Sequence, residues 1–235
     1  MNRRIILLGV SAAMLGMAGP ILAGTSIWTD GDPSSHYWDA SLNWDNHWVP
    51  QPGDLAGVGS GATAGHECVI DDTIPSQACS NLIVAIGGNM IFDGGQLTVS
   101  DWTFVGHDGA QTAPGLVEML GGTLNAGSLW IGNGGPGQVN AHGGTINTDD
   151  LILDAGLQAG LLDITEGVVI EAGNTVDTVM TWVGNGWITA YGGDPAYHVT
   201  AVYDDVSGVT RIATIPEPAT LILLSLGSLL LRRKS

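Results

Sequence analysis

The sequence predicts an all-β protein whose centre is a parallel β-solenoid (β-helix) of about four coils, each with three strands. Three observations favour this class. Glycine supplies 36 of 235 residues, lysine is nearly absent and aspartate outnumbers glutamate 18 to 5, so turn formers are abundant and good helix formers are scarce. A short glycine-led motif recurs with a period near 22 residues. Runs of alternating hydrophobicity separate its copies, as in half-buried strands.

The repeats define the predicted coils. The motif reads Gly-Gly-Gln-Leu-Thr-Val from residue 94, Gly-Gly-Thr-Leu-Asn-Ala from residue 121 and Gly-Gly-Thr-Ile-Asn-Thr from residue 143, with a degenerate copy from residue 166. Each copy holds three short alternating runs bounded by glycine-rich turns. A period of this length with three strands matches one coil of a solenoid, in which successive coils pair through parallel ladders. We assign residues 66–172 to this solenoid.

The alternation also assigns faces, because successive side chains of a strand point to opposite sides. Leu97, Leu124, Ile146 and Val169 are expected to point inward as one stack. The outward residues are expected to form three kinds of column. One is apolar, with Ile83, Phe104, Trp130 and Ile152; one is polar, with Gln96, Thr123 and Thr145 beside Thr98, Asn125 and Asn147; and one is acidic, with Glu118, Asn140 and Asp163.

Tryptophan marks the segment before the solenoid. Trp28, Trp38, Trp44 and Trp48 lie within residues 24–65. A solenoid needs a cap over its first coil, and aromatic bulk can supply one. The favoured interpretation is a packed N-terminal cap, and the alternative is a platform on which sugar rings stack.

A second cap is expected after the solenoid, over residues 173–215. Asn174 or Thr175 can cap a short helix that runs to about Val183. Two alternating runs, 197–203 and 209–213, then predict a β-hairpin. Arg211 lies on its second strand and is expected to pair with a nearby aspartate.

Cys68 and Cys79 are the only cysteines. In an oxidising compartment they are candidates for a disulfide across the turn between them, and the alternative is two buried thiols. A zinc site is poorly supported because the cysteines lack CxxC spacing.

Both ends of the chain resemble targeting segments. Residues 1–23 hold two arginines, an apolar stretch and a small-residue cleavage site, which predicts a secretory signal peptide. Residues 216–235 hold Pro216-Glu217-Pro218, an apolar run of 13 residues and a basic end with Arg232, Arg233 and Lys234. The apolar run is shorter than the ~20 residues that span a bilayer comfortably.

The order of these C-terminal parts closely resembles the PEP-CTERM sorting signal of Gram-negative bacteria. The resemblance implies an exosortase-type processing protease as a partner, transient anchoring in the inner membrane, and export to the cell envelope, outer surface or exopolysaccharide matrix. An ordinary uncut C-terminal anchor is the alternative. The repeats of residues 79–171 also resemble the β-helical repeats of autotransporter-like and PEP-CTERM proteins, although Gly-Gly-Thr-Leu is a motif of low specificity.

Charge excludes several classes of partner. The net charge is −17, and between residues 24 and 215 a single base, Arg211, stands against 22 acidic residues. Such a surface cannot neutralise nucleic-acid phosphates or hold to an anionic membrane, so membrane contact is expected only through the terminal segments. Neutral glycans and cations are the compatible partners.

No nucleophile motif, HExxH or phosphate-binding loop is present, so no catalytic residue is assigned and we expect no enzymatic activity. The six histidines are scattered and are expected in turns or on the surface. No cofactor is predicted. Ca²⁺ is possible, because aspartate carboxylates supply the oxygen ligands that it prefers, but no residue is assigned as a metal ligand. The candidate aspartate groups are Asp30 with Asp32, Asp71 with Asp72, Asp149 with Asp150 and Asp154, and Asp204 with Asp205.

These features predict an exported, acidic structural or adhesive protein of the cell envelope or exopolysaccharide matrix. The first alternative is a module that binds glycan or calcium, with Trp130 and Phe104 as candidate glycan contacts. The second is a glycoside-cleaving β-helix enzyme that uses the acidic column, or an ice-binding protein that uses the threonine column.

Overall fold

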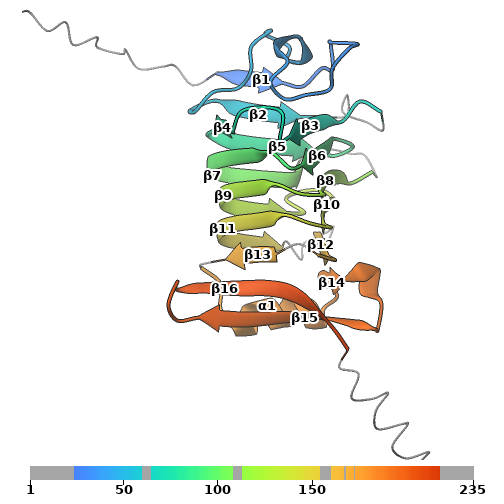
Figure 1. Cartoon of the computed structure of the whole chain (residues 1–235), viewed down its shortest axis with the longest axis vertical. Coiled ribbons are helices and arrows are strands. Elements are labelled where there is room, and N and C mark those ends of the chain that lie inside the picture. Colours follow the sequence, from blue (N-terminus) through green and yellow to red (C-terminus); the bar gives the residue numbers. More distant parts are fainter. Residues whose placement is uncertain are drawn as a thin grey trace, which may run out of the picture.

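The computed structural model of the chain describes residues 24–59, 65–107, 113–153, 160–166, 168–171 and 173–217. It shows a column of stacked β-coils, with a loop-rich cap at the N-terminal end and a long hairpin at the C-terminal end (Figure 1). The predicted signal peptide lies outside the described residues, as does the predicted sorting segment beyond residue 217.

Two sheets build the column. The larger has the order β1, β2, β5, β7, β9, β11, β13, β16 and β15, with β4 also beside β7. Its strands are β1 (Thr25–Ile27), β2 (Leu55–Val58), β4 (Gln77–Cys79), β5 (Asn81–Ala85), β7 (Gln96–His107), β9 (Thr123–Ile131), β11 (Thr145–Leu153), β13 (Val168–Glu171), β15 (Tyr197–Asp204) and β16 (Val209–Pro216). The smaller has the order β14, β12, β10, β8, β6 and β3. Its strands are β3 (Cys68–Asp71), β6 (Asn89–Asp93), β8 (Gly115–Met119), β10 (Gly137–Ala141), β12 (Leu161–Ile164) and β14 (Ile188–Ala190).

The coils pair in parallel, which confirms the predicted parallel β-solenoid. It has about five turns rather than four. The difference arises because β3, β6 and β14 join the smaller sheet although none of them belongs to a glycine-led repeat. Strands β1 and β2 likewise extend the larger sheet into the tryptophan-rich segment.

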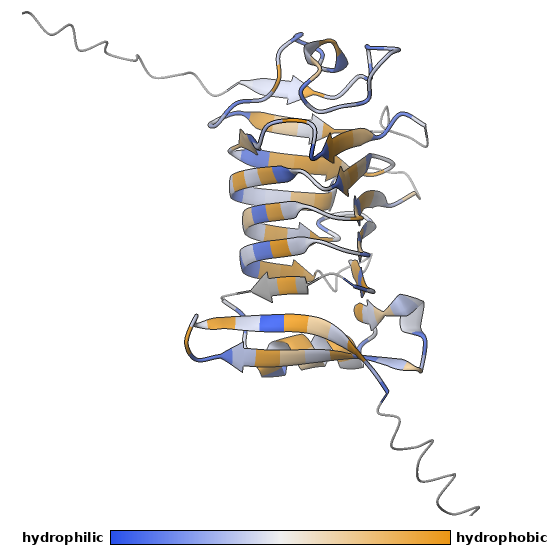
Figure 2. Cartoon of the chain, viewed as in Figure 1, coloured by the Kyte–Doolittle hydropathy of each residue, from blue (hydrophilic) through white to orange (hydrophobic). Residues whose placement is uncertain are grey.

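The predicted inward stack is confirmed. Leu97 pairs with Leu124, Leu124 with Ile146, and Ile146 with Val169, and all four side chains are buried. Figure 2 shows the same alternation as hydrophobic and hydrophilic bands along the strands. Burying a Leu or Ile side chain contributes about 1.5–3 kcal/mol, so a continuous apolar stack holds the coils together.

Three tryptophans form the core of the N-terminal cap, beside the short 3-10 helix η1 (Ser41–Asn43). Trp28, Trp38 and Trp44 are buried, and the Trp44 ring meets the other two edge to face at centroid distances of 5.3 and 4.8 Å. Trp48 is 53% exposed. The packed-cap interpretation therefore fits three of the four tryptophans.

The C-terminal cap contains the predicted helix and hairpin. Helix α1 (Val176–Gly184) is capped by Thr175, whose hydroxyl accepts a hydrogen bond from the Thr178 amide. Val179 is buried, whereas Met180 is exposed. After the 3-10 helix η2 (Tyr191–Gly193), β15 and β16 pair in antiparallel fashion, and β16 also pairs with β13.

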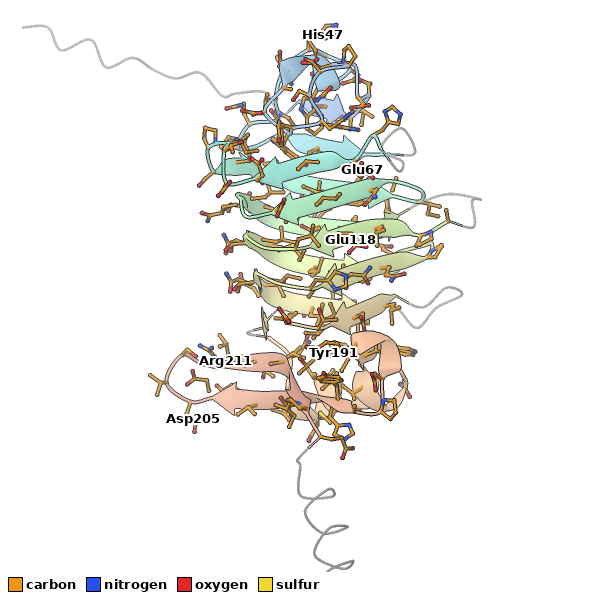
Figure 3. All side chains as sticks on the ribbon, turned by 45° about the vertical axis from the view of Figure 1, so that its right-hand side comes forward. His47, Glu67, Glu118, Tyr191, Asp205 and Arg211 are labelled. Atoms are coloured by element: carbon orange, nitrogen blue, oxygen red, sulfur yellow. The ribbon has the colours of Figure 1, made fainter. Side chains whose placement is uncertain are left out.

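Arg211 lies on the hairpin with Asp205, at the opposite end of the column from His47 (Figure 3). Its Nε is 3.9 Å from the Asp204 carboxylate, so the predicted pairing with an aspartate is confirmed. Within the described ranges, no helix is long and apolar enough to span a membrane.

Candidate functional site

Apolar side chains line the outer surface of β5, β7, β9 and β11, and those of β7 and β9 are aromatic. The predicted apolar column is in register: Ile83 pairs with Phe104, Phe104 with Trp130, and Trp130 with Ile152. Trp102 joins it, because residues two apart on β7 point to the same side. We call Trp102, Phe104 and Trp130 the aromatic ridge.

The ridge has defined ring geometry. Trp102 stacks on Phe104 with a centroid distance of 4.3 Å and an interplanar angle of 22°, and Phe104 meets Trp130 edge to face at 5.5 Å. His107 stacks on Phe104 at 4.9 Å. All three ridge side chains are half-buried. Part of each is therefore fixed against its neighbours while part faces solvent.

A polar groove lies just before the ridge on the same strands. Its volume is about 440 Å³, and its lining includes Thr98, Asn125, Asn147 and Asp149. The Asn147 side chain donates a hydrogen bond to the Asn125 side-chain oxygen at 2.8 Å, and Asn125 donates to the Thr98 hydroxyl at 3.5 Å. The Thr98, Asn125 and Asn147 row of the predicted polar column therefore forms a ladder of amides and a hydroxyl in this groove.

The acidic column is in register but its carboxylates are engaged. Asn140 pairs with Glu118 and with Asp163 in neighbouring coils. Glu118, midway along the column in Figure 3, accepts a hydrogen bond from the Asn140 amide at 2.7 Å and lies 3.2 Å from His142 Nε2. Asp163 is buried and accepts hydrogen bonds from the Thr189 hydroxyl at 2.5 Å and the Gly192 amide at 2.8 Å. These contacts give Asp163 a structural role in the coil corner.

Both cysteines are buried free thiols, so the candidate disulfide between Cys68 and Cys79 is not formed. Cys68 lies on β3 of the smaller sheet and Cys79 on β4 of the larger one. Burial, with a smaller contribution from the Asp54 charge, raises the pKa of Cys79 to about 12. Burial and the Asp30 charge also raise the pKa of Cys68. Both thiols are therefore protonated at neutral pH.

Several aspartates of the candidate calcium groups close turns. The Asp32 carboxylate accepts hydrogen bonds from the hydroxyl and amide of Ser34, and these bonds lower its pKa. Asp71 does the same with Thr73, and the Thr73 hydroxyl is the main cause of its lowered pKa. Asp204 accepts from the amides of Val206 and Ser207, and hydrogen bonding to Ser207 is the main cause of its lowered pKa. Local turn formation accounts for these three carboxylates, while Asp154 lies outside the described residues.

Two residues of the predicted sorting signal belong to the folded part. Pro216 ends β16, and the Glu217 amide donates a hydrogen bond to the Ala196 carbonyl at 2.7 Å. The Glu217 carboxylate also contacts His198 Nε2. Pro218, Arg232, Arg233 and Lys234 lie outside the described residues.

Comparison with known protein families, curated proteins and solved structures found no match for this chain. The candidate sites therefore rest on geometry alone. The structure brings the predicted glycan contacts Phe104 and Trp130 together and places Trp102 and His107, which were not predicted, against Phe104. The Trp-x-Phe spacing at 102–104 carries the signal for Trp102, because alternate residues of a strand share a face.

Proposed function

We propose that this chain is an exported, non-enzymatic structural or adhesive protein that holds neutral polysaccharide on its aromatic ridge. The observation that carries the proposal is the outward stack of Trp102, Phe104 and Trp130 across neighbouring coils. The exposed parts of Trp102 and Trp130 offer rigid apolar area, which suits the C–H faces of sugar rings, while the Phe104 ring is stacked on by Trp102 and His107 and holds the ridge together. Trp102 and Phe104 lie on β7 and Trp130 lies on β9, about 4.8 Å away, so the ridge covers two neighbouring coils.

The neighbouring groove supports the same proposal. The amide and hydroxyl groups of Thr98, Asn125 and Asn147 can donate and accept hydrogen bonds, as sugar hydroxyls require. The groove precedes the ridge along the same strands.

Charge selects the class of polysaccharide. The net charge is −17, and Arg211, the only Arg or Lys between residues 24 and 217, lies on the hairpin. Acidic polysaccharides would meet repulsion without a compensating base, whereas neutral ones carry no such penalty. The acidic column gives the glycoside-cleaving alternative little support, because Glu118 and Asp163 are engaged in hydrogen bonds.

The export part of the proposal rests on the two terminal segments. The signal-peptide pattern and the resemblance to the PEP-CTERM signal support secretion, processing by an exosortase-type protease, and a final place in the envelope or exopolysaccharide matrix. A neutral polysaccharide of that matrix is the ligand that such a location would offer.

Affinity electrophoresis tests the binding proposal. The purified protein would be run through gels that contain neutral polysaccharides (dextran, mannan or hydroxyethyl cellulose) or the anionic polysaccharide alginate. We expect at least one neutral polysaccharide to retard the protein, to a similar extent at low salt and at about 0.5 M salt, because stacking is not screened. Retardation by alginate alone, or by none of the polymers, would contradict the proposal.

A further inference from the structure

A histidine–aspartate cluster in the N-terminal cap is unrelated to the ridge. His36 Nδ1 lies 2.6 Å from Oδ1 of Asp30, and His66 Nδ1 contacts Oδ2 of the same carboxylate. One ligand atom from each of the three residues lies within 4.8 Å of the others. The two imidazole rings stand nearly perpendicular, with centroids 5.9 Å apart. The histidines were expected to be scattered turn or surface residues, but folding brings these two together.

We propose that Asp30, His36 and His66 form a binding site for Zn²⁺ that ties the N-terminal cap to the first coil. Two imidazole nitrogens and one carboxylate oxygen are a ligand set that zinc prefers, with a fourth position left for water. Ca²⁺ prefers six to eight oxygen ligands, so this cluster suits zinc rather than the calcium considered for Asp30 and Asp32.

The charge around Asp30 supports a cation. Its side chain is only 6% exposed, and a buried carboxylate needs a partner charge. Arg211, the only Arg or Lys between residues 24 and 217, is in the hairpin at the other end of the column and pairs there with Asp204. A divalent ion between the two imidazoles would supply positive charge at the place where the chain has no Arg or Lys.

The backbone holds the three residues in place. The His36 carbonyl accepts a hydrogen bond from the Val69 amide at 2.9 Å, which attaches it to β3. The His66 carbonyl accepts one from Trp28 Nε1 at 3.3 Å, which attaches it to the cap core. Asp30 adopts a left-handed backbone conformation, with φ of 51°, which places its carboxylate between the rings. The cluster is thus built from two cap residues and from His66, which lies two residues before β3; its sequence neighbour Glu67 is labelled in Figure 3.

The rings have room to adjust around an ion. Tetrahedral zinc with bonds of about 2.0–2.1 Å needs ligand atoms about 3.3 Å apart, slightly more than the present contacts. His36 and His66 are 39% and 58% exposed at their side chains, so both rings can swing outward. With its proton on Nε2, each ring presents the Nδ1 lone pair to the metal.

Zinc titration of the untagged full chain tests the site. Equilibrium dialysis with elemental analysis is expected to give one zinc per chain, and zinc at about 100 times its dissociation constant should raise Tm by about 5–10 °C. The variant His66→Ala removes an exposed ligand and is expected to fold, yet to lose both the stoichiometric zinc and the Tm shift. Asp30→Asn should lose them as well.

His198→Ala is the matched control, because His198 also contacts a carboxylate, that of Glu217, but lies in the C-terminal cap. This variant should bind zinc as the wild type does. No bound zinc in the wild type, or equal binding in wild type and His66→Ala, would overturn the proposal. The proposal would also be overturned if millimolar Ca²⁺ raised Tm as much as zinc does and this shift persisted in His66→Ala.

Discussion

Replacing Gly122 with alanine is expected to lower the free energy of unfolding by more than about 4 kcal/mol, among the largest effects of a single substitution. Gly122 has a φ of +73°, and an added Cβ would lie 2.1 Å from the Gly95 carbonyl oxygen of the preceding coil. That carbonyl already accepts the Thr123 amide at 2.9 Å. The added methyl group would therefore force two coils apart where they are hydrogen-bonded.

Gly184→Ala is the matched control. Gly184 ends α1, and a Cβ built there meets nothing within 4 Å. Thermal unfolding followed by circular dichroism should show a fall in Tm of about 10 °C or more for Gly122→Ala and almost no change for Gly184→Ala. Similar Tm values for the two variants would show that the coils do not stack through this corner.

The second large effect is expected for Trp44→Ala, which should cost about 3–5 kcal/mol. Trp44 is fully buried, contacts Trp28 and Trp38 edge to face, and donates its Nε1–H to the Trp38 carbonyl at 2.8 Å. Its removal leaves a cavity in the cap and an unpaired carbonyl. A loosened cap also covers the end of the first coil less well. The strand edge exposed there can then pair with another chain, which favours aggregation.

Trp48→Ala provides the comparison for this prediction, because the Trp48 side chain is about half exposed. Chemical denaturation should give a midpoint close to that of the wild type for Trp48→Ala, and a much lower midpoint for Trp44→Ala. Equal losses in both variants would mean that the buried tryptophan cluster does not hold the cap together.

The glycine-led repeats were sufficient to predict the solenoid and the register of its centre. Their period-2 alternation placed Leu97, Leu124 and Ile146 in one stack, and Phe104 and Trp130 in one column, because a regular coil leaves little choice of register. Strands β3 and β6 were missed because they carry no repeat motif. Their pairing depends on coils that precede the first recognisable repeat.

The sequence predicted the parts of the candidate sites that lie on repeating strands and missed the parts that depend on loops. Trp130 follows from the repeat, whereas Asp30, His36 and His66 come from separate loops whose meeting is set by backbone contacts to β3 and Trp28. The choice between a disulfide and two buried thiols could not be made from the sequence for a similar reason. A separation of 11 residues suggested proximity, but the chain turns a corner of the coil between Cys68 and Cys79 and places them in different sheets.

Binding of neutral polysaccharide to the aromatic ridge is tested most directly by comparing Trp130→Ala with Trp48→Ala. Trp130 belongs to the ridge, while Trp48 is an exposed tryptophan in the cap. The dissociation constant for the neutral polysaccharide that retards the wild type most would be measured by affinity electrophoresis, after circular dichroism has shown that both variants are folded. We predict that Trp130→Ala weakens binding at least about tenfold and that Trp48→Ala leaves it unchanged. Unchanged binding in folded Trp130→Ala, or an equal loss in Trp48→Ala, would contradict the claim.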